Sequence, residues 1–165
     1  MNPLIQFQKT TLLLLVALAC FGLSPRVQAV VPPPDGGYPG KNTAEGDDAL
    51  FKLTTGTDNT ATGFQALFRN TSGSNNTATG SQALFSNAVN QFGQPADDNT
   101  AIGFQALFSN LAGDANTAIG SQALFSNRAG ALNTATGFQA LYNNTIGGDN
   151  TAMGFRALFL IHAAV

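Results

Sequence analysis

Polar and apolar residues follow one another along this chain in a fixed order that returns at a regular interval. The clearest unit is NTATGFQALFRN, residues Asn59–Asn70, and the sequence holds six clear copies and one weaker copy. The copies begin at Asn42 (the weaker one), Asn59, Asn76, Asn99, Asn116, Asn133 and Asn150. Each start follows the one before it at the same spacing, except that the interval from Asn76 to Asn99 is longer. Such a period predicts a repeat solenoid of about seven stacked coils, each of about 17 residues, because one unit is too small to bury its own apolar face.

Several positions of the unit hold the same small or apolar residue in every clear copy. We predict that the recurring glycine lets neighbouring coils approach closely, and that the recurring alanine, leucine and aromatic residue form the core. Burying each large side chain contributes about 1.5–3 kcal/mol. In three of the units the predicted core residues are Gly63, Ala66, Leu67, Phe68, Gly103, Ala106, Leu107, Phe108, Gly137, Ala140, Leu141 and Tyr142.

The conformation within one unit is open between helix and strand. Gly63, Ala66, Leu67 and Asn70 are spaced as on one face of a helix, whereas the recurring residues occupy both sides of a strand drawn through the same stretch. We therefore expect a short extended Asn-Thr-Ala segment followed by one short helix in each coil. The alternative is a left-handed parallel β-roll without helices.

The asparagines that open and close each unit have two candidate roles. Repeated in every coil, Asn59 and Asn70 would form amide ladders at the corners, but asparagine is also a common turn and cap residue. We expect Asn70 to be a turn residue, and both roles stay open for Asn59.

One connector is six residues longer than the others and spans Ala88 to Asp98. Insertions in a solenoid emerge on one face and often carry binding residues, although surface loops also tolerate insertion without a function. The candidate binding residues of this loop are Phe92, Asp97 and Asp98.

Residues 1–29 are typical of a secretory signal peptide. Lys9 precedes an apolar run, and Val27-Gln28-Ala29 supplies a small-residue cleavage site. An uncut membrane anchor is the alternative, but the apolar run is shorter than the roughly 18 residues of a spanning helix. We expect processing after Ala29, which removes Cys20, the single cysteine. Residues 30–41 form a linker rich in proline and glycine, and the solenoid covers residues 42–165.

Composition argues against catalysis and against nucleic-acid binding. After cleavage the chain has five cations and nine acids, a formal charge of −4, and no basic stripe. His162, the single histidine, lies near the C-terminus, so no serine-histidine-acid set can be assembled in the body of the chain. A row of acids that precede the repeat asparagines is broken by Asn75, Ala115 and Leu132, which argues against calcium. We predict no enzymatic activity, no cofactor and no metal.

The unit NTAIG at Asn99–Gly103, followed by Ala106-Leu107-Phe108, resembles the head repeats of bacterial trimeric autotransporter adhesins, the YadA-like head family. The resemblance implies a trimeric, surface-exposed left-handed β-roll that adheres to host or matrix surfaces. We expect an exported, non-enzymatic protein, extracellular or attached to the cell surface or outer membrane, whose partners are further copies of itself or a host, matrix or envelope component. The alternative is a tail-fibre-like component of a phage-derived secreted device.

The apolar C-terminal residues predict a contact surface. Residues 158–165 carry no charge and end the array without a polar cap, whereas Glu45, Asp47 and Asp48 seal the first unit. Because exposed apolar patches usually mark contacts, we expect a partner at the C-terminal end, unless residues 155–165 fold back over it. We also expect the chain to be a head without a stalk or a membrane barrel.

Overall fold

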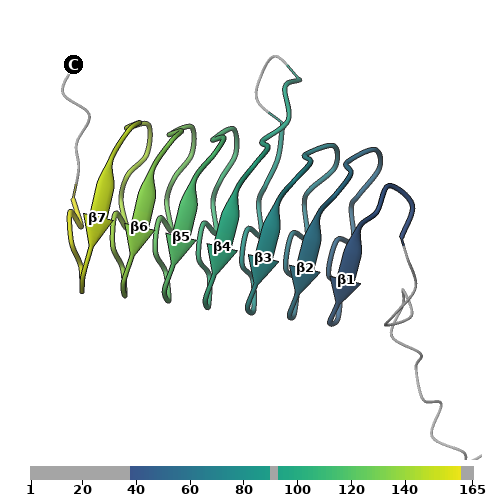
Figure 1. Ribbon diagram of the computed structural model, residues 1–165, viewed down its shortest axis with the longest axis horizontal. Helices are drawn as coiled ribbons and strands as arrows, with labels where there is room; N and C mark the ends of the chain where they lie inside the picture. Colours follow the sequence, from purple (N-terminus) through teal and green to yellow (C-terminus); the bar gives the residue numbers. More distant parts are fainter. Residues whose placement is uncertain (1–37, 90–92, 161–165) are drawn as a thin grey trace, which may run out of the picture.

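A computed structural model describes residues 38–89 and 93–160, which wind into one parallel β-solenoid (Figure 1). Each coil contributes one three-residue strand, and the seven strands lie side by side in chain order. They are β1 (Thr43–Glu45), β2 (Thr60–Thr62), β3 (Thr77–Thr79), β4 (Thr100–Ile102), β5 (Thr117–Ile119), β6 (Thr134–Thr136) and β7 (Thr151–Met153). We number the coils 1 to 7 after their strands, with six complete turns between β1 and β7. The predicted solenoid is confirmed, while the predicted signal peptide lies outside the described residues.

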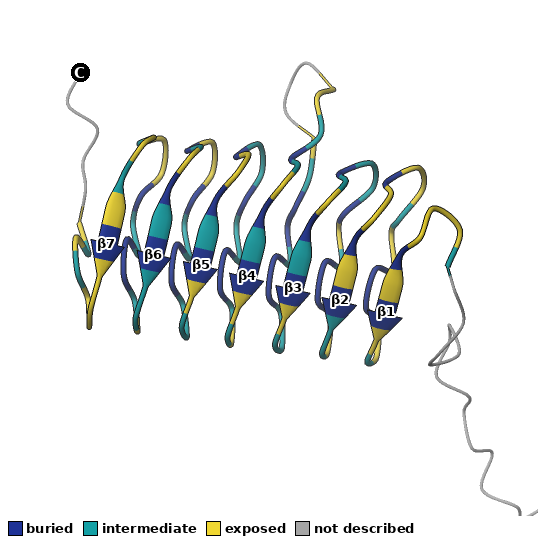
Figure 2. Cartoon of the chain, in the orientation of Figure 1, coloured by how far each residue is buried: buried dark blue, intermediate teal, exposed yellow. Residues whose placement is uncertain are grey.

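The register of the sheet follows the repeat. Thr60 of β2 pairs with Thr77 of β3, and Thr77 pairs with Thr100 of β4 across the longer interval. In each strand the central alanine is buried and its two neighbours point outward, as the blue band across the strands in Figure 2 shows. The insertion therefore leaves the sheet undisturbed and projects from the row between β3 and β4 (Figure 1).

The prediction of a short helix after each strand is wrong, since the described residues contain no helix. After β2 the chain passes through Gly63, Gln65 and Leu67 with φ of 127°, 55° and 52°, whereas an α-helix needs φ near about −63°. Two tight turns result, closed by Ala66 N–H to Gly63 O (3.2 Å) and by Asn70 N–H to Leu67 O (3.0 Å). The helix-like spacing arises because the two turns place Ala66 and Leu67 inward together.

Backbone hydrogen bonds between coils stabilise this unusual segment. Leu67 N–H donates to Ala83 O of the next coil (3.0 Å), and Gln65 N–H donates to Asp47 O of the coil before (2.8 Å). A left-handed conformation costs about 1–2 kcal/mol at a residue other than glycine. The cross-coil bonds and the burial of Leu67 offset that cost, so this wall is stable only when coils stack.

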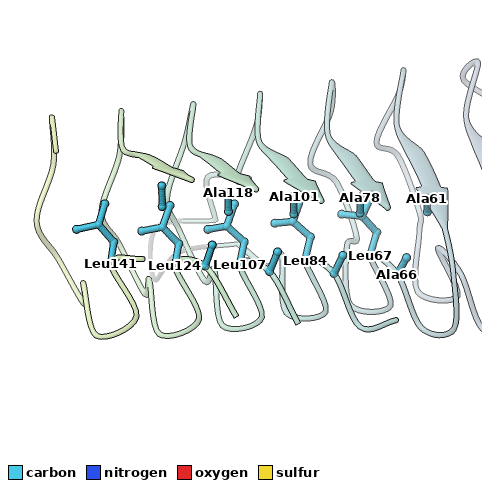
Figure 3. Packing of buried hydrophobic residues seen from close by; sticks show 14 of the residues in the cluster. Ala61, Ala66, Leu67, Ala78, Leu84, Ala101, Leu107, Ala118, Leu124 and Leu141 are labelled. Carbon is cyan, nitrogen blue, oxygen red and sulfur yellow. The ribbon is translucent and has the colours of Figure 1, made fainter. Parts of the chain in front are cut away.

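The interior of the solenoid is a narrow column of alanine and leucine side chains (Figure 3). Ala66, Leu67, Ala106, Leu107, Ala140 and Leu141 are fully buried, as predicted. Close approach at the glycines is also confirmed, because a Cβ on Gly63 would lie 2.7 Å from the carbonyl carbon of Gly80. Gly103 and Gly137 are packed in the same way against the coils that follow them.

The recurring aromatic residue lies outside this column, so the prediction of Phe68, Phe108 and Tyr142 as interior core is wrong. These rings form one continuous stack on the outer wall, with centroids 5.0–5.4 Å apart and nearly parallel planes. Each contact of this kind contributes about 0.5–1.5 kcal/mol beyond area burial. The stack runs through Phe51, Phe68, Phe85, Phe108, Phe125, Tyr142 and Phe159.

Two buried asparagine ladders connect the coils, one from Asn42 to Asn150 and a shorter one from Asn70 to Asn144. The backbone N–H and Nδ2 of Asn59 both donate to Oδ1 of Asn42, at 2.9 and 3.0 Å, and the same pair of bonds recurs up to Asn150. The second ladder begins where Nδ2 of Asn87 donates to Oδ1 of Asn70 (3.3 Å) and continues to Asn144. Asn70 also closes its turn onto Gly73, so it takes both candidate roles and the expectation of a turn residue alone is wrong.

Candidate binding surface

A row of partly buried glutamines connects successive coils through side-chain hydrogen bonds. Nε2 of Gln82 donates to Oε1 of Gln65 (3.2 Å), and the pattern continues to Gln139. The first place in this row is held by Asp48, whose Oδ2 accepts a bond from Gln65, and the last place is held by Arg156. The row therefore begins with an anionic side chain and ends with a cationic one.

A second row of side chains follows the strands at the corner of each coil. We call it the Phe/Ser row, and it consists of Phe64, Ser81, Phe104, Ser121, Phe138 and Phe155. The phenylalanines of coils 2, 4 and 6 are each 43–49 % exposed, and Phe138 stacks on Phe155 at 5.3 Å. Beside this row, two residues earlier in each coil, Ile102, Ile119 and Met153 also face solvent. Together they form an exposed apolar band along the solenoid.

The predicted binding loop separates into a projecting part and a part built into the coil. Phe92 lies outside the described residues. The chain rejoins the solenoid at Ala96, whose buried carbonyl accepts bonds from Asn76 and Asn87. Oδ1 of Asp97 accepts a bond from Ser74 N–H (2.7 Å), and Asp98 N–H donates to Ser74 O (3.1 Å). The backbone of both aspartates therefore belongs to the stacked coil, and the carboxylate of Asp97 fixes coil 4 to coil 3.

Within residues 38–89 and 93–160, no three or more His, Cys, Asp or Glu side chains gather as a metal site would require. One hollow of about 290 Å³ lies at the N-terminal end, lined by Tyr38, Leu50 and Leu53 among others. Burial raises the pKa of Tyr38, and its hydroxyl is buried without a partner among the described groups. The polar side chains that line the hollow are those of Tyr38 and three threonines, Thr54, Thr55 and Thr57, and its lining contains no His, Cys, Asp, Glu, Lys or Arg.

The aromatic side chain that covers coil 1 was missed from the sequence. Tyr38 precedes the first recognisable unit and lies in the stretch taken as linker, yet its N–H donates to Asn42 O (3.3 Å). Counting back by one repeat length from Thr55, which occupies the matching place in coil 1, would have brought Tyr38 into the array. The solenoid therefore begins a few residues before Asn42.

No family model, curated protein or solved structure matches this chain. Since the described residues form strands and turns alone, they include no helix that could cross a membrane.

Proposed function

We propose that this chain is an exported, non-enzymatic repeat protein that acts at a surface, as an adhesin-like head or as a structural element. The exposed apolar band carries this proposal. Exposed patches of this kind mark contact surfaces, and here an exposed phenylalanine returns in coils 2, 4 and 6 along the solenoid. Such an arrangement suits an extended partner that presents many equivalent contacts rather than a small substrate.

The resemblance to YadA-like heads supports the same proposal and adds two finer points to it. It implies a left-handed β-roll and an assembly of three copies at the bacterial surface. The secretory signal predicted at residues 1–29 agrees with such a location.

Replacement of the three phenylalanines of coils 2, 4 and 6 tests the role of the band. The triple variant Phe64→Ser, Phe104→Ser and Phe138→Ser introduces the residue that coils 3 and 5 already carry, so the fold should be retained. We expect binding of the purified chain to immobilised extracellular-matrix protein to fall at least tenfold, as when several anchor residues of an interface are truncated.

A matched control replaces exposed apolar residues outside the band, Leu132→Ser and Ile146→Ser, which are 60 % and 61 % exposed. This control should bind as the original chain does. Equal binding by the triple variant and the control would refute the band as the contact surface. Recovery of the chain from the cell interior with residues 1–29 still attached would refute export.

A tail-fibre-like component of a phage-derived secreted device is the second candidate. The elongated single-layer stack suits a fibre as well as an adhesin head, and the genes beside this one separate the two. Sheath and baseplate genes in that position would favour the fibre.

A further inference from the structure

The two end coils carry backbone groups that the interior coils always pair. At the boundary of coils 1 and 2, Gly63 N–H donates to Glu45 O, Gln65 N–H donates to Asp47 O, and Leu50 N–H donates to Ala66 O. Lys52 N–H donates to Phe68 O in the same way. The same four bonds recur at every boundary, up to that between coils 6 and 7. Each coil therefore carries two donors and two acceptors for the coil that follows, and the four matching groups for the coil that precedes.

At the C-terminal end, the groups of coil 7 that would bond to a following coil have no partner among the described residues. Leu158 and Leu160 offer free N–H groups, and Met153 and Phe155 offer free carbonyl oxygens. Oδ1 of Asn150 is the matching open acceptor of the asparagine ladder. These five groups occupy the places that in coil 6 are bonded to coil 7.

The N-terminal end carries the matching groups, those that would bond to a preceding coil. The N–H groups of Gly46 and Asp48 and the carbonyl oxygens of Ala49 and Phe51 make no bond within the described part of the chain. By the interior pattern, the two donors match Met153 O and Phe155 O, and the two acceptors match Leu158 N–H and Leu160 N–H. All four pairs have a donor on one side and an acceptor on the other. The place opposite Asn150 Oδ1 belongs to Asn42, which is paired with Tyr38 in an antiparallel bridge.

Side chains at the two ends are complementary in charge and shape as well. The glutamine row ends in Arg156 on one side and begins with Asp48 on the other. The aromatic stack ends in Phe159 and begins with Phe51, whose ring is more than half exposed. Coil 1 also carries Glu45 and Asp47, and with Asp48 these acids outnumber Lys41 and Lys52 at this end. Both terminal rings have a cation close by, since Nζ of Lys52 lies 5.3 Å from the centroid of Phe51 and Cζ of Arg156 lies 4.0 Å from that of Phe159.

We propose that copies of this chain stack end to end, with β7 of one copy pairing in parallel with β1 of the next. The junction would continue the coil boundary that the chain already makes six times. Arg156, whose Cζ lies 4.0 Å from the centroid of Phe159, would turn from that ring to Asp48 of the second copy, and Phe159 would stack on its Phe51. Because this contact joins different surfaces, it leaves both outer ends open and generates a filament rather than a closed ring. The inference depends on the coil geometry and not on the function proposed above.

Tyr38 limits this assembly. Its N–H occupies Asn42 O, the acceptor that Thr151 N–H of the preceding copy would use by the interior pattern, and its side chain packs on the end of the core. Stacking therefore requires Tyr38 to move aside, and the cost of that movement sets a concentration below which copies remain separate.

Charge reversal at the two ends tests the proposal with the full chain. The variants Asp48→Lys and Arg156→Asp each place like charges at the junction, so each alone should lose about tenfold in association constant by analytical ultracentrifugation. An equimolar mixture of the two variants should recover filaments, because every junction then pairs opposite charges. Electron micrographs of the mixture should show filaments as wide as those of the original chain.

The control pair Asp98→Lys and Arg128→Asp changes the same charges at exposed interior sites and should leave association unchanged. A chain that stays monomeric at all concentrations would overturn the proposal. So would association that neither end variant weakens, which would indicate contact through the flanks. Contact between two C-terminal ends would be shown if Asp48→Lys had no effect and the mixture gave dimers only.

Discussion

The N-terminal and C-terminal ends of the solenoid are built from the same repeat, yet they meet their surroundings in different ways. At the N-terminal end Tyr38 lies over coil 1, and Ala49 and Leu50 are buried beneath it. At the C-terminal end Leu158, which holds the same place as Leu50, is 50 % exposed, and Phe155 is 74 % exposed. The two end coils therefore differ because Tyr38 packs on the apolar layer of coil 1, while the matching layer of coil 7 is exposed among the described residues.

This difference shows where the stability of the fold resides. A coil of this kind contains one three-residue strand and two strained turns, and most of its bonds are made to its neighbours. In such arrays the total stability is close to a sum of unit terms and boundary terms. An interior coil has two boundaries and an end coil has one, so the same substitution should have a different cost in the two places.

The largest effect is expected from a deletion that breaks the register. Removing the whole unit 116–132 joins Ala115 to Asn133 and restores the order of the unit, so a shorter solenoid should fold. Removing only residues 116–123 joins Ala115, which precedes a strand, to Leu124, which lies in a turn. The coils on either side then no longer match in register, so cooperative unfolding should be lost. Circular dichroism with chemical denaturation compares the two, and equal tolerance of both deletions would show that the repeats are not structural units.

A smaller effect is expected from replacing the recurring leucine, and its size should differ between a middle coil and the end coil. Leu107→Ala removes a fully buried side chain and should lower the free energy of unfolding by about 2–5 kcal/mol. Leu158→Ala, in the open end coil, should lower it by less than about 1 kcal/mol when copies are diluted apart. A cost at Leu158 as large as that at Leu107 in dilute solution would mean that the chain's own C-terminal residues cover this end.

A modest effect on stability is also expected at Tyr38. Tyr38→Ala uncovers coil 1 and should lower the free energy of unfolding by about 1 kcal/mol, since the ring is only partly buried. The same change should strengthen end-to-end association several-fold, because less structure must be displaced. Sedimentation measures the second effect, and an unchanged association constant would show that Tyr38 does not restrict access to coil 1.

The sequence was sufficient to predict the architecture and the innermost residues. A constant period fixes that units stack, and the invariant Ala66 and Leu67 were recognisable as core because they never vary in polarity. The turn between them was not predictable in the same way. Gln65 and Leu67 adopt positive φ, which neither residue favours alone, so the conformation depends on bonds from neighbouring coils that no single unit contains.

The outer wall illustrates a second limit of sequence reasoning. Phe68 recurs with Leu67 and is equally apolar, yet it stacks on Phe51 and Phe85 outside the column. A recurring residue shows that its position tolerates few residue types. A side chain that packs inward and one that stacks on the next coil along the axis both recur, so periodicity does not distinguish them. Asn70 was underestimated for the same reason, because its partner on Asn87 lies one coil away along the axis.

The candidate loop residues were only partly interpretable. Asp97 and Asp98 belong to the longest connector in the sequence, which suggested exposure and binding. The structure places both where the chain has already returned to the repeat pattern, directly before Asn99. Counting backward from the next unit, rather than forward from the previous one, separates such residues from the true insertion.

The single longer interval would leave a signature if the protein were stretched. Pulling on the two ends loads the bonds between coils one boundary after another, so the coils should come away singly. An ordinary coil, such as the one from Asn59 to Asn76, would release about 58 Å of extended chain, while the coil with the insertion would release about 78 Å. A force trace would therefore show equal steps interrupted by one longer step, whose place in the series reports from which end the solenoid unravels.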